Sequence, residues 1–235
     1  MKFSYESIPK EDRKPTIGLI VLQSDETIEN ELQQWLPPHE FDLLVSRVPS
    51  GEEVTEETLG EMANHITKSA ELFPRSSRFS VIGYGCTSGT SVIGAENVAE
   101  LVKSGCETKI VTNPMSALVA ACNRRNIRRL AFLSPYLESV SDHLRKVVRQ
   151  HGIESPVFGT FNEGEEAKVA WINPSSIRSA AKNLAGQGDV DGIFLSCTNL
   201  KTFGLLEPLT EELGLPVLSS NFVLAEELRY LSTSY

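Results

Sequence analysis

The sequence predicts an α/β protein built from two similar lobes, each containing a parallel sheet. Along its 235 residues, short apolar runs rich in β-branched residues alternate with longer segments of helical periodicity. This alternation is typical of parallel strands joined by crossover helices. Two further observations indicate a loose duplication: similar apolar runs at 17–21 and 130–133 open the two halves, and each half later carries a Cys-Thr pair directly after a predicted strand.

Strands are predicted where short apolar runs end at turn or breaker residues. In chain order they cover residues 16–22, 41–48, 78–84, 108–112, 129–133, 153–158, 192–196 and 216–219. The segments between them have helical periodicity and predict helices at 29–35, 56–72, 91–103, 115–125, 138–150, 174–185, 204–213 and 221–231. Breakers such as Asn113-Pro114 and Asn173-Pro174 separate these elements.

The length of the chain allows two compact lobes, since a domain typically has roughly 100 to 150 residues. We place the boundary near Asn113-Pro114 and assign residues 1–113 to the first lobe and residues 114–215 to the second. The last predicted strand and helix, residues 216–235, are assigned to the first lobe.

Composition limits the compartment and the partners. The formal charge of -9 opposes non-specific attraction to nucleic acid or to anionic lipid, and no apolar run approaches the roughly 20 residues of a membrane span. The four cysteines form no CxxC pair, and the polar start of the chain lacks the apolar core of a signal peptide. These features predict a cytoplasmic protein with reduced thiols and with neither nucleic acid nor membrane as partner.

Cys86 and Cys197 are the residues whose positions indicate a catalytic role. Each follows a predicted strand, and the carboxyl ends of parallel strands are where open α/β folds place ligand crevices. Glycines and hydroxyls around Cys86 predict an anion-binding turn, and the helix that follows is expected to lower the pKa of the Cys86 thiol. Two thiols facing each other across one crevice can move a proton across a substrate carbon.

Other interpretations of these residues are weaker. Cys106 and Cys122 have no matching neighbours and are predicted to be small buried hydrophobes. The glycine-rich turn could hold a nucleotide phosphate, but the GxxxxGK[ST] lysine and the GxGxxG spacing are both missing. The histidines lack metal-ligand spacing, so no metal is expected.

Several motifs together resemble the aspartate/glutamate racemase superfamily, in the branch of maleate cis-trans isomerases and arylmalonate decarboxylases. The motifs are Ile17-Gly18-Leu19-Ile20-Val21, Gly85-Cys86-Thr87-Ser88, Ser134-Pro135-Tyr136, Ser196-Cys197-Thr198 and Pro216-Val217-Leu218-Ser219-Ser220-Asn221. Within the branch, residues 22–29 and 197–202 look most like the racemase-like protein encoded with ectoine utilization enzymes.

The resemblance implies two pseudo-symmetric flavodoxin-like lobes, an active site between them, and chemistry without a cofactor. It implies that Cys86 and Cys197 are catalytic, and it implies a homodimer. The residues expected to bind a small carboxylate substrate are Thr87, Ser88, Tyr136, Thr198, Asp25, Gln23 and Glu166.

Departures from the family pattern narrow the expected reaction. The decarboxylases have glycine at the position of Cys86, so the presence of both thiols favours an isomerase or racemase. Maleate isomerases have asparagine at the positions of Asp25 and Glu166, and an acidic side chain would repel a second substrate carboxylate. We therefore expect racemisation of an amino acid or an acylated diamino acid, as in ectoine catabolism. The alternatives are maleate-type cis-trans isomerisation through a cysteine adduct and a ligand-binding module without catalysis.

Overall fold

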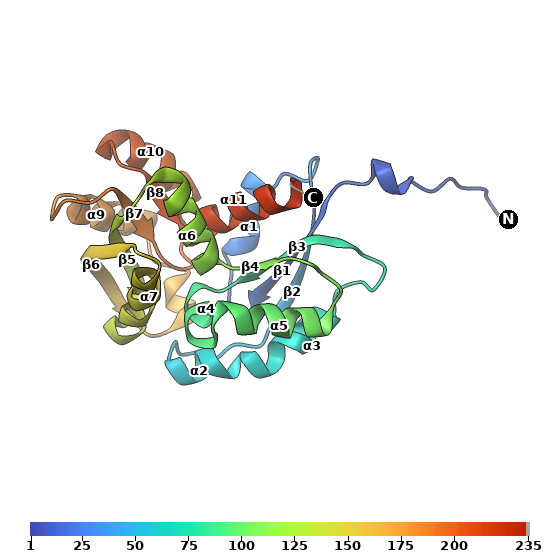
Figure 1. The fold of residues 1–235 in the computed structure, drawn as a ribbon, viewed down its shortest axis with the longest axis horizontal. Coiled ribbons are helices and arrows are strands. Elements are labelled where there is room, and N and C mark those ends of the chain that lie inside the picture. The colour runs from blue at the N-terminus through green and yellow to red at the C-terminus, as the bar shows by residue number, and fades with distance from the viewer. Residues whose placement is uncertain (234–235) are drawn as a thin grey trace.

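The computed structural model describes residues 1–233 and contains two four-stranded parallel sheets in two adjacent lobes (Figure 1). The first sheet has the order β2-β1-β3-β4 and the second has the order β6-β5-β7-β8. The strands are β1 (Thr16–Leu22), β2 (Asp42–Val48), β3 (Phe79–Gly85), β4 (Val111–Thr112), β5 (Arg129–Tyr136), β6 (Glu154–Glu163), β7 (Gly192–Leu195) and β8 (Val217–Ser219). Each strand of one sheet thus has a counterpart at the same place in the other, which confirms the predicted duplication.

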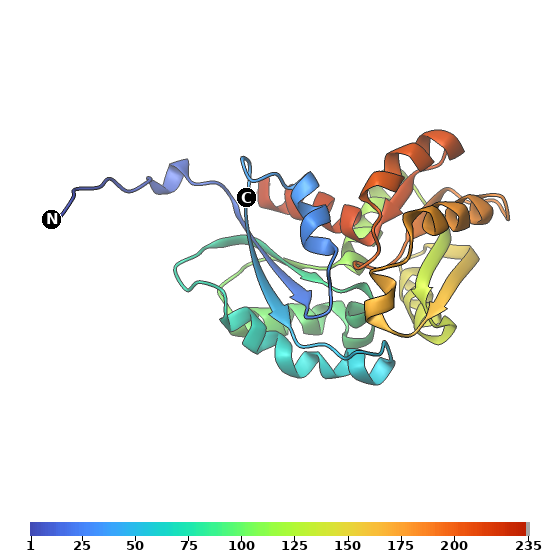
Figure 2. The ribbon, with the colours of Figure 1, turned by 180° about the vertical axis from the view of Figure 1, so that it is seen from behind.

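Helices connect the strands and cover the sheets. They are α1 (Ile28–Trp35), α2 (Glu56–Glu61), α3 (Ala63–Glu71), α4 (Thr87–Ile93), α5 (Ala95–Gly105), α6 (Pro114–Arg125), α7 (Glu138–Gln150), α8 (Glu166–Val169), α9 (Pro174–Ala185), α10 (Phe203–Leu213) and α11 (Ser220–Thr233), with one 3-10 turn at Lys10–Asp12. Residues 1–13, apart from that turn, form an extended arm that projects away from both lobes (Figures 1 and 2).

Three helical segments differ from the sequence prediction. The helix predicted at 56–72 is divided between α2 and α3 at Met62. The helix predicted at 91–103 is divided between the end of α4 and α5, which meet at Gly94, whose φ of 91° is a conformation that favours glycine. The short helix α8 was not predicted, because four residues are too few to display helical periodicity.

The assignment of the final strand to the first lobe is wrong. β8 pairs in parallel with β7, so it closes the edge of the second sheet. Helix α10 forms the crossover between these two strands, and strands joined in this way usually lie side by side. Helix α11 then leaves the second lobe and packs on β3 and α1 of the first as well as on α6 (Figure 2).

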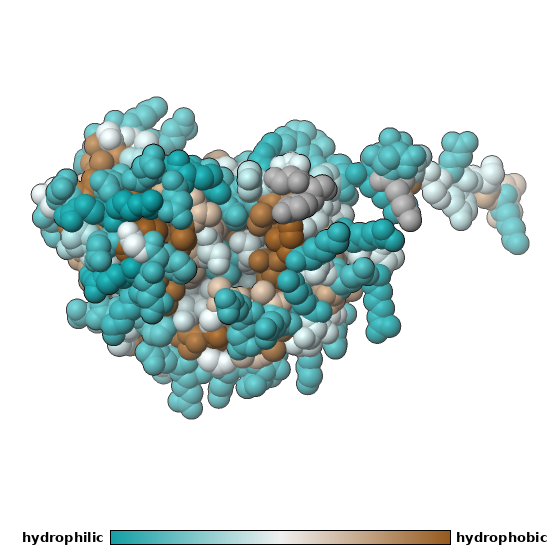
Figure 3. Space-filling view, viewed as in Figure 1, coloured by the Kyte–Doolittle hydropathy of each residue, from teal (hydrophilic) through white to brown (hydrophobic). Residues whose placement is uncertain are grey.

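The face seen in Figure 3 is mostly hydrophilic, with apolar residues in separate small patches. Within residues 1–233, none of the helices combines the length and the apolar character that crossing a membrane requires.

Candidate active site

Cys86 occupies the first of two matching turns, between β3 and α4. It is the N-cap residue of α4, and its Sγ accepts a hydrogen bond of 3.1 Å from the backbone N–H of Gly89. A Cβ on residue 89 would lie 2.9 Å from this sulfur and 2.6 Å from Cε of Met62. Only glycine therefore lets the helix backbone approach the Cys86 thiol this closely.

Cys197 occupies the second turn, after β7. Its φ of 115° is one that residues other than glycine rarely adopt, at a cost on the order of 1–3 kcal/mol. Three contacts hold the turn: the Cys197 N–H donates to Ser220 Oγ at 2.9 Å, the Asn199 N–H donates to Cys197 Sγ at 3.2 Å, and Tyr136 Oη lies 2.8 Å from the same sulfur. Strain of this kind persists only where the surroundings determine the geometry, and here they do.

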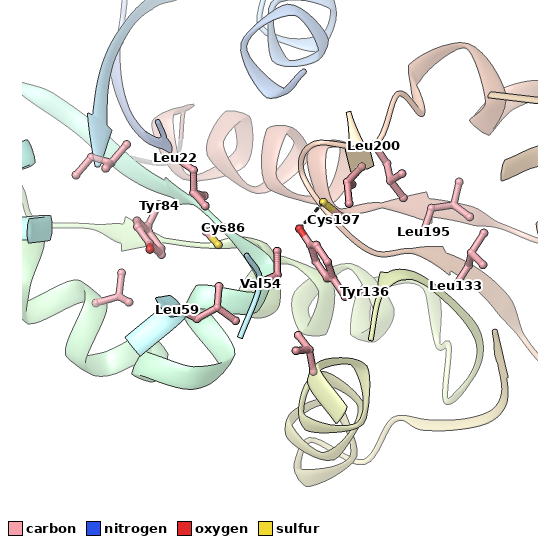
Figure 4. Packing of buried hydrophobic residues seen from close by; sticks show 14 of the residues in the cluster. Leu22, Val54, Leu59, Tyr84, Cys86, Leu133, Tyr136, Leu195, Cys197 and Leu200 are labelled. Carbon is pink, nitrogen blue, oxygen red and sulfur yellow. Dashed lines mark hydrogen bonds between the residues drawn. The ribbon is translucent and has the colours of Figure 1, made fainter. Parts of the chain in front are cut away.

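The two turns meet at the interface between the lobes. Thr87 Oγ1 donates to Ser220 Oγ at 2.9 Å, and Thr198 Oγ1 donates to the carbonyl of Gly85 at 3.3 Å. Cys86 and Cys197 are buried in the same hydrophobic cluster, and Figure 4 shows them at the ends of their strands with Tyr136 beside Cys197. The structure therefore brings both thiols to one place, from opposite lobes.

Glu166 and Tyr136 form a buried pair next to Cys197. The Tyr136 hydroxyl donates to Glu166 Oε2 at 3.0 Å, and Asn199 Nδ2 donates to Glu166 Oε1 at 3.0 Å. Both Glu166 and Tyr136 are only 5% exposed. No lysine or arginine is within ion-pair distance of Glu166 in the described part of the chain, so hydrogen bonds alone offset the burial of this carboxylate.

Asp25 lies on the loop between β1 and α1 and is also buried. Its Oδ1 accepts from the N–H groups of Thr27 and Ile28 at 2.8 Å each, at the beginning of α1. Its Oδ2 is buried and has no hydrogen-bond partner. One oxygen of Asp25 therefore has a structural role, while the other has no hydrogen bond of good geometry, although the Thr198 side chain is close enough to lower the pKa of Asp25.

Burial dominates the pKa values in this site. It raises the pKa of Cys86 to about 12, an effect that the charges of Glu166 and Asp25 increase and that the Gly89 and Ser88 N–H groups only partly oppose. The expectation of a lowered Cys86 pKa is therefore wrong, because desolvation outweighs the helix N-terminus. Burial likewise raises the pKa of Cys197 and of Asp25, and it raises that of Glu166 to about 7.

A small cavity lies between the two lobes. Five of the predicted site residues line it: Cys86, Thr87, Tyr136, Glu166 and Thr198. Residues 50–54, here called the strap, reach across from the first lobe, where the Val54 N–H donates to the Gly164 carbonyl at 2.9 Å and the Glu166 N–H donates to that of Glu52 at 3.1 Å. The free volume of about 10 Å³ has room for about one water molecule. A carboxylic acid is larger, so these strap contacts must open to admit it.

The family is shown by a match over nearly the whole chain. Residues 17–227 match the family model described as arylmalonate decarboxylase. The chain belongs to this family. The maleate isomerase of Nocardia farcinica is 26% identical to it over 87% of this chain and 84% of that protein, and the maleate isomerase of Geobacillus stearothermophilus is 24% identical over 87% and 86%.

Solved structures of the arylmalonate decarboxylase family have the same fold. A maleate isomerase from Pseudomonas putida has a TM-score of 0.84 at 21% identity, covering 93% of both chains. A cysteine-to-serine variant of the N. farcinica maleate cis-trans isomerase, with a covalently bound succinylcysteine intermediate, has a TM-score of 0.80 at 23% identity over 93% of both chains. A double variant of arylmalonate decarboxylase has a TM-score of 0.82 at 20% identity over 94% of both.

Four of the nine predicted site residues do not line the cavity: Gln23, Asp25, Ser88 and Cys197. The Gln23 side chain is exposed, and the backbone of Gln23 joins β2 through a hydrogen bond from its N–H to the Val48 carbonyl. Ser88 is buried beside Cys86 and Thr87, and its Oγ has no hydrogen-bond partner. Gln23 thus has no contact with the thiols, whereas Ser88 keeps a free hydroxyl near them.

Four further residues, not predicted from the sequence, hold the Cys197 turn in place. They are Glu31, Asn199, Ser220 and Asn221, all buried. Asn221 Nδ2 donates both to the Thr198 carbonyl at 2.8 Å and to Glu31 Oε2 at 2.9 Å, and Glu31 also accepts from the Phe203 N–H at 2.8 Å. Ser220 and Asn221 belong to one of the quoted motifs, but their partners are distant in sequence, so the motif alone does not reveal these contacts.

The raised pKa of Glu166 predicts a pH dependence of stability. Between its ordinary pKa of 4.5 and about 7, the folded protein binds the Glu166 proton more tightly than the unfolded chain does. The stabilising contribution is therefore fully present below pH 4.5 and is lost as pH rises to about 7, a change of up to ~3 kcal/mol. Urea denaturation of wild type and Glu166→Gln at pH 4.5 and 7.5 measures it: the wild type loses stability relative to the variant. Parallel stability curves would contradict the burial argument.

Proposed function

We propose that this protein is a cofactor-independent isomerase that acts on a small carboxylic acid with Cys86 and Cys197. The observation that supports this most is that both thiols follow equivalent strands, β3 and β7, and enter one buried cluster from opposite lobes. Its relatives are maleate isomerases, and one of them carries a covalent cysteine intermediate. Both findings favour cysteine chemistry over a binding module without catalysis.

The reaction proposed first is racemisation by two-cysteine proton transfer. One thiolate removes the Cα proton from one face of the substrate, and the opposite thiol delivers a proton to the other face. The roles of the two thiols exchange with the hand of the substrate. Hydroxyl groups beside the thiols, among them those of Ser88, Thr87 and Thr198, would hold the substrate carboxylate and stabilise the enediolate charge as it develops.

The proposed substrate carries one carboxylate and a nitrogen substituent, as in an amino acid or an acylated diamino acid. Two buried acids, Asp25 and Glu166, lie near the thiols, and each affects the pKa of Cys86. A second substrate carboxylate would meet this negative charge and be repelled. An ammonium or amide group would instead donate to Asp25 Oδ2, which is buried without a hydrogen bond of good geometry, once the site opens far enough to expose Asp25, a residue outside the present cavity wall.

A specific observation favours a second candidate, maleate-type cis-trans isomerisation. The N. farcinica maleate isomerase structure contains a succinylcysteine. Addition of a thiolate to one alkene carbon, with protonation of the other, would produce such an adduct, and rotation about the new single bond followed by elimination of the thiolate and the proton would release the trans acid. Both candidate reactions need the same pair of thiols, so they can be told apart only by which substrates the protein converts.

The deciding experiment supplies amino acids, N-acylated diamino acids and maleate to the protein in deuterated water. Proton NMR and mass spectrometry detect deuterium at Cα, and ultraviolet absorbance follows the alkene. Deuterium at Cα with loss of optical rotation supports the racemase, whereas alkene conversion without it supports the maleate-type reaction. Absence of both with every substrate would contradict the proposed isomerase, with Cys86→Ser serving as the background control.

Asp25→Asn tests the charge argument directly. The variant keeps the Oδ1 acceptor for the Thr27 and Ile28 N–H groups, so α1 should begin normally. We expect kcat/KM for the nitrogen-bearing substrate to fall about tenfold as a charged hydrogen bond is lost, and activity on maleate to rise. Steady-state kinetics on both substrates provides the measurement. Unchanged activity on amino acids with no gain on maleate would refute the argument.

A further inference from the structure

The hydroxyl of Tyr136 has a single proton and two acceptors within reach. Its oxygen lies 3.0 Å from Glu166 Oε2 and 2.8 Å from Cys197 Sγ. An ionised carboxylate only accepts hydrogen bonds, so with ionised Glu166 the tyrosine proton points to Oε2. Cys197 must then donate its S–H to the tyrosine oxygen. The three groups therefore form a directed chain from sulfur through oxygen to carboxylate.

Protonation of Glu166 reverses this chain. A neutral Glu166 donates to the Tyr136 oxygen, which frees the tyrosine proton to point toward Cys197 Sγ. A hydrogen bond from a neutral donor to a sulfur anion is charge-assisted and stabilises it. The thiolate of Cys197 is thus favoured when Glu166 holds the extra proton, and the thiol is favoured when Glu166 is ionised.

We propose that Glu166 stores the proton of Cys197, which passes through Tyr136 whenever Cys197 acts as a thiolate. The S–H bond of Cys197 breaks as its proton moves to the Tyr136 oxygen, and the original tyrosine proton moves to Glu166 Oε2. The products are a thiolate, an intact tyrosine and a neutral carboxyl group, so charge and protons balance without a co-reactant. This inference rests on the proposed function, in which Cys197 must ionise, and makes Glu166 a positioning residue that acts through Tyr136.

The surroundings keep this proton inside the site. Asn199 holds both ends of the chain, because its Nδ2 donates to Glu166 Oε1 at 3.0 Å and its N–H donates to Cys197 Sγ at 3.2 Å. The cavity beside Glu166 has room for about one water. With the strap contacts in place, bulk solvent is a poor competitor for the Cys197 proton.

The charged groups around Glu166 come from several elements. Asp25, on the β1–α1 loop, raises its pKa, while Tyr136 on β5 and Asn199 before α10 lower it by donating hydrogen bonds. Cys86 lines the cavity with Glu166, and Cys197 shares the Tyr136 hydroxyl with it; the charge of Glu166 adds to the effect of burial in raising the pKa of both thiols. Arg47, on β2, acts on Asp25. The relay serves Cys197 because the Tyr136 hydroxyl contacts the sulfur of Cys197, whereas the hydrogen bond to the sulfur of Cys86 comes from the Gly89 N–H.

The test is the pH dependence of alkylation of Cys197, measured with iodoacetamide and peptide mass spectrometry on the full chain without substrate. While the pH is below its pKa, a thiol that ionises alone reacts about tenfold faster for each unit by which the pH rises. A shared proton gives a coupled titration. The rate of Cys197 alkylation should therefore rise up to about pH 7 and then stay level from about pH 7.5 to 9, where Cys197 and Glu166 together hold one proton. The alkylation rate of Cys86 in the same sample should keep rising with pH. Because both thiols are reached only when the strap opens, Cys86 serves as the internal reference for that opening.

Variants separate the relay from a structural role. Glu166→Gln removes the proton acceptor, and Tyr136→Phe removes the hydroxyl that connects it to Cys197. In each variant the level region should be replaced by a tenfold rise in the Cys197 alkylation rate per pH unit. Glu166→Asp should restore the inflection, and Glu165→Gln, at the exposed neighbouring acid that pairs with Lys168, should leave the profile unchanged. A variant that merely loosened the fold would speed up alkylation of buried Cys122 as well.

The outcomes are distinct from those of the substrate panel. A Cys197 rate that rises tenfold per unit from pH 7 to 9 in the wild type, in parallel with Cys86, overturns the relay even if the enzyme isomerises a substrate. A level region that Glu166→Gln removes supports the relay even if no tested acid is turned over. An unchanged level region in Glu166→Gln also overturns it.

Discussion

Replacement of either Cys86 or Cys197 by serine is expected to lower kcat at least about 10³-fold, because a serine hydroxyl is far less acidic than a thiol and cannot supply the base or the nucleophile. Each variant keeps the other thiol of the cluster, but a single thiol cannot remove a proton from one face of the substrate and deliver one to the opposite face. Racemisation is followed by polarimetry and alkene conversion by ultraviolet absorbance, with each variant compared with the wild type.

The control for the serine variants is Cys106→Ser. Cys106 is partly exposed at the end of α5 and should tolerate the change with kcat within about twofold, since surface substitutions are usually small in effect. Thermal unfolding of all three variants shows whether the active-site proteins remain folded. Near-normal kcat in a folded Cys86→Ser or Cys197→Ser protein would eliminate the two-thiol scheme.

Tyr136→Phe is expected to have the next largest effect, a loss of about 10²-fold in kcat, the magnitude typical of removing one donor in a buried site. The substitution leaves the ring in place but removes the hydroxyl that bonds Glu166 Oε2 and contacts Cys197 Sγ. Because this hydroxyl lowers the pKa of Cys197, its loss makes the thiolate harder to form. Steady-state kinetics should show the loss in kcat with KM changed much less.

Tyr84→Phe is a matched control for Tyr136→Phe. Tyr84 is fully buried, and its hydroxyl donates to the sulfur of Met62 rather than to a thiol. Its removal should change kcat by less than about threefold while costing up to about 1 kcal/mol of stability, the usual net contribution of a hydrogen bond. Equal losses in the two variants would show that Tyr136 acts through packing and not through its hydroxyl.

Much of the fold could be predicted because the signals are local. The strand at Thr16–Leu22 is an uninterrupted apolar run and was predicted with the bounds that the structure has. Pro114 and Pro174 each begin a helix just after an asparagine whose side chain caps it, as the breaker positions indicated. The break at Gly94 and the register of β8 depend on packing against other elements, so periodicity could not reveal them.

The candidate site could be predicted only in part. Cys86, Tyr136 and Cys197 follow or end strands, and motif positions are enough to find such residues. Glu31 and Asn221 are separated by most of the chain, and only the packing of α1 and α11 brings their side chains together. The direction in which the pKa of Cys86 shifts could also be found only from the structure, because desolvation depends on what surrounds the sulfur.

The order of apolar runs and turns along this chain was by itself sufficient to determine two parallel sheets with a cysteine at the end of a strand in each. This information is local: strand, turn and helix preferences act over a few residues. Only the tertiary structure decided that both thiols lie in one buried cluster, that β8 joins the second sheet, and that Tyr136 links Cys197 to a buried acid. Burial and hydrogen-bond direction arise from contacts between distant segments, and these exist only once the lobes have packed together.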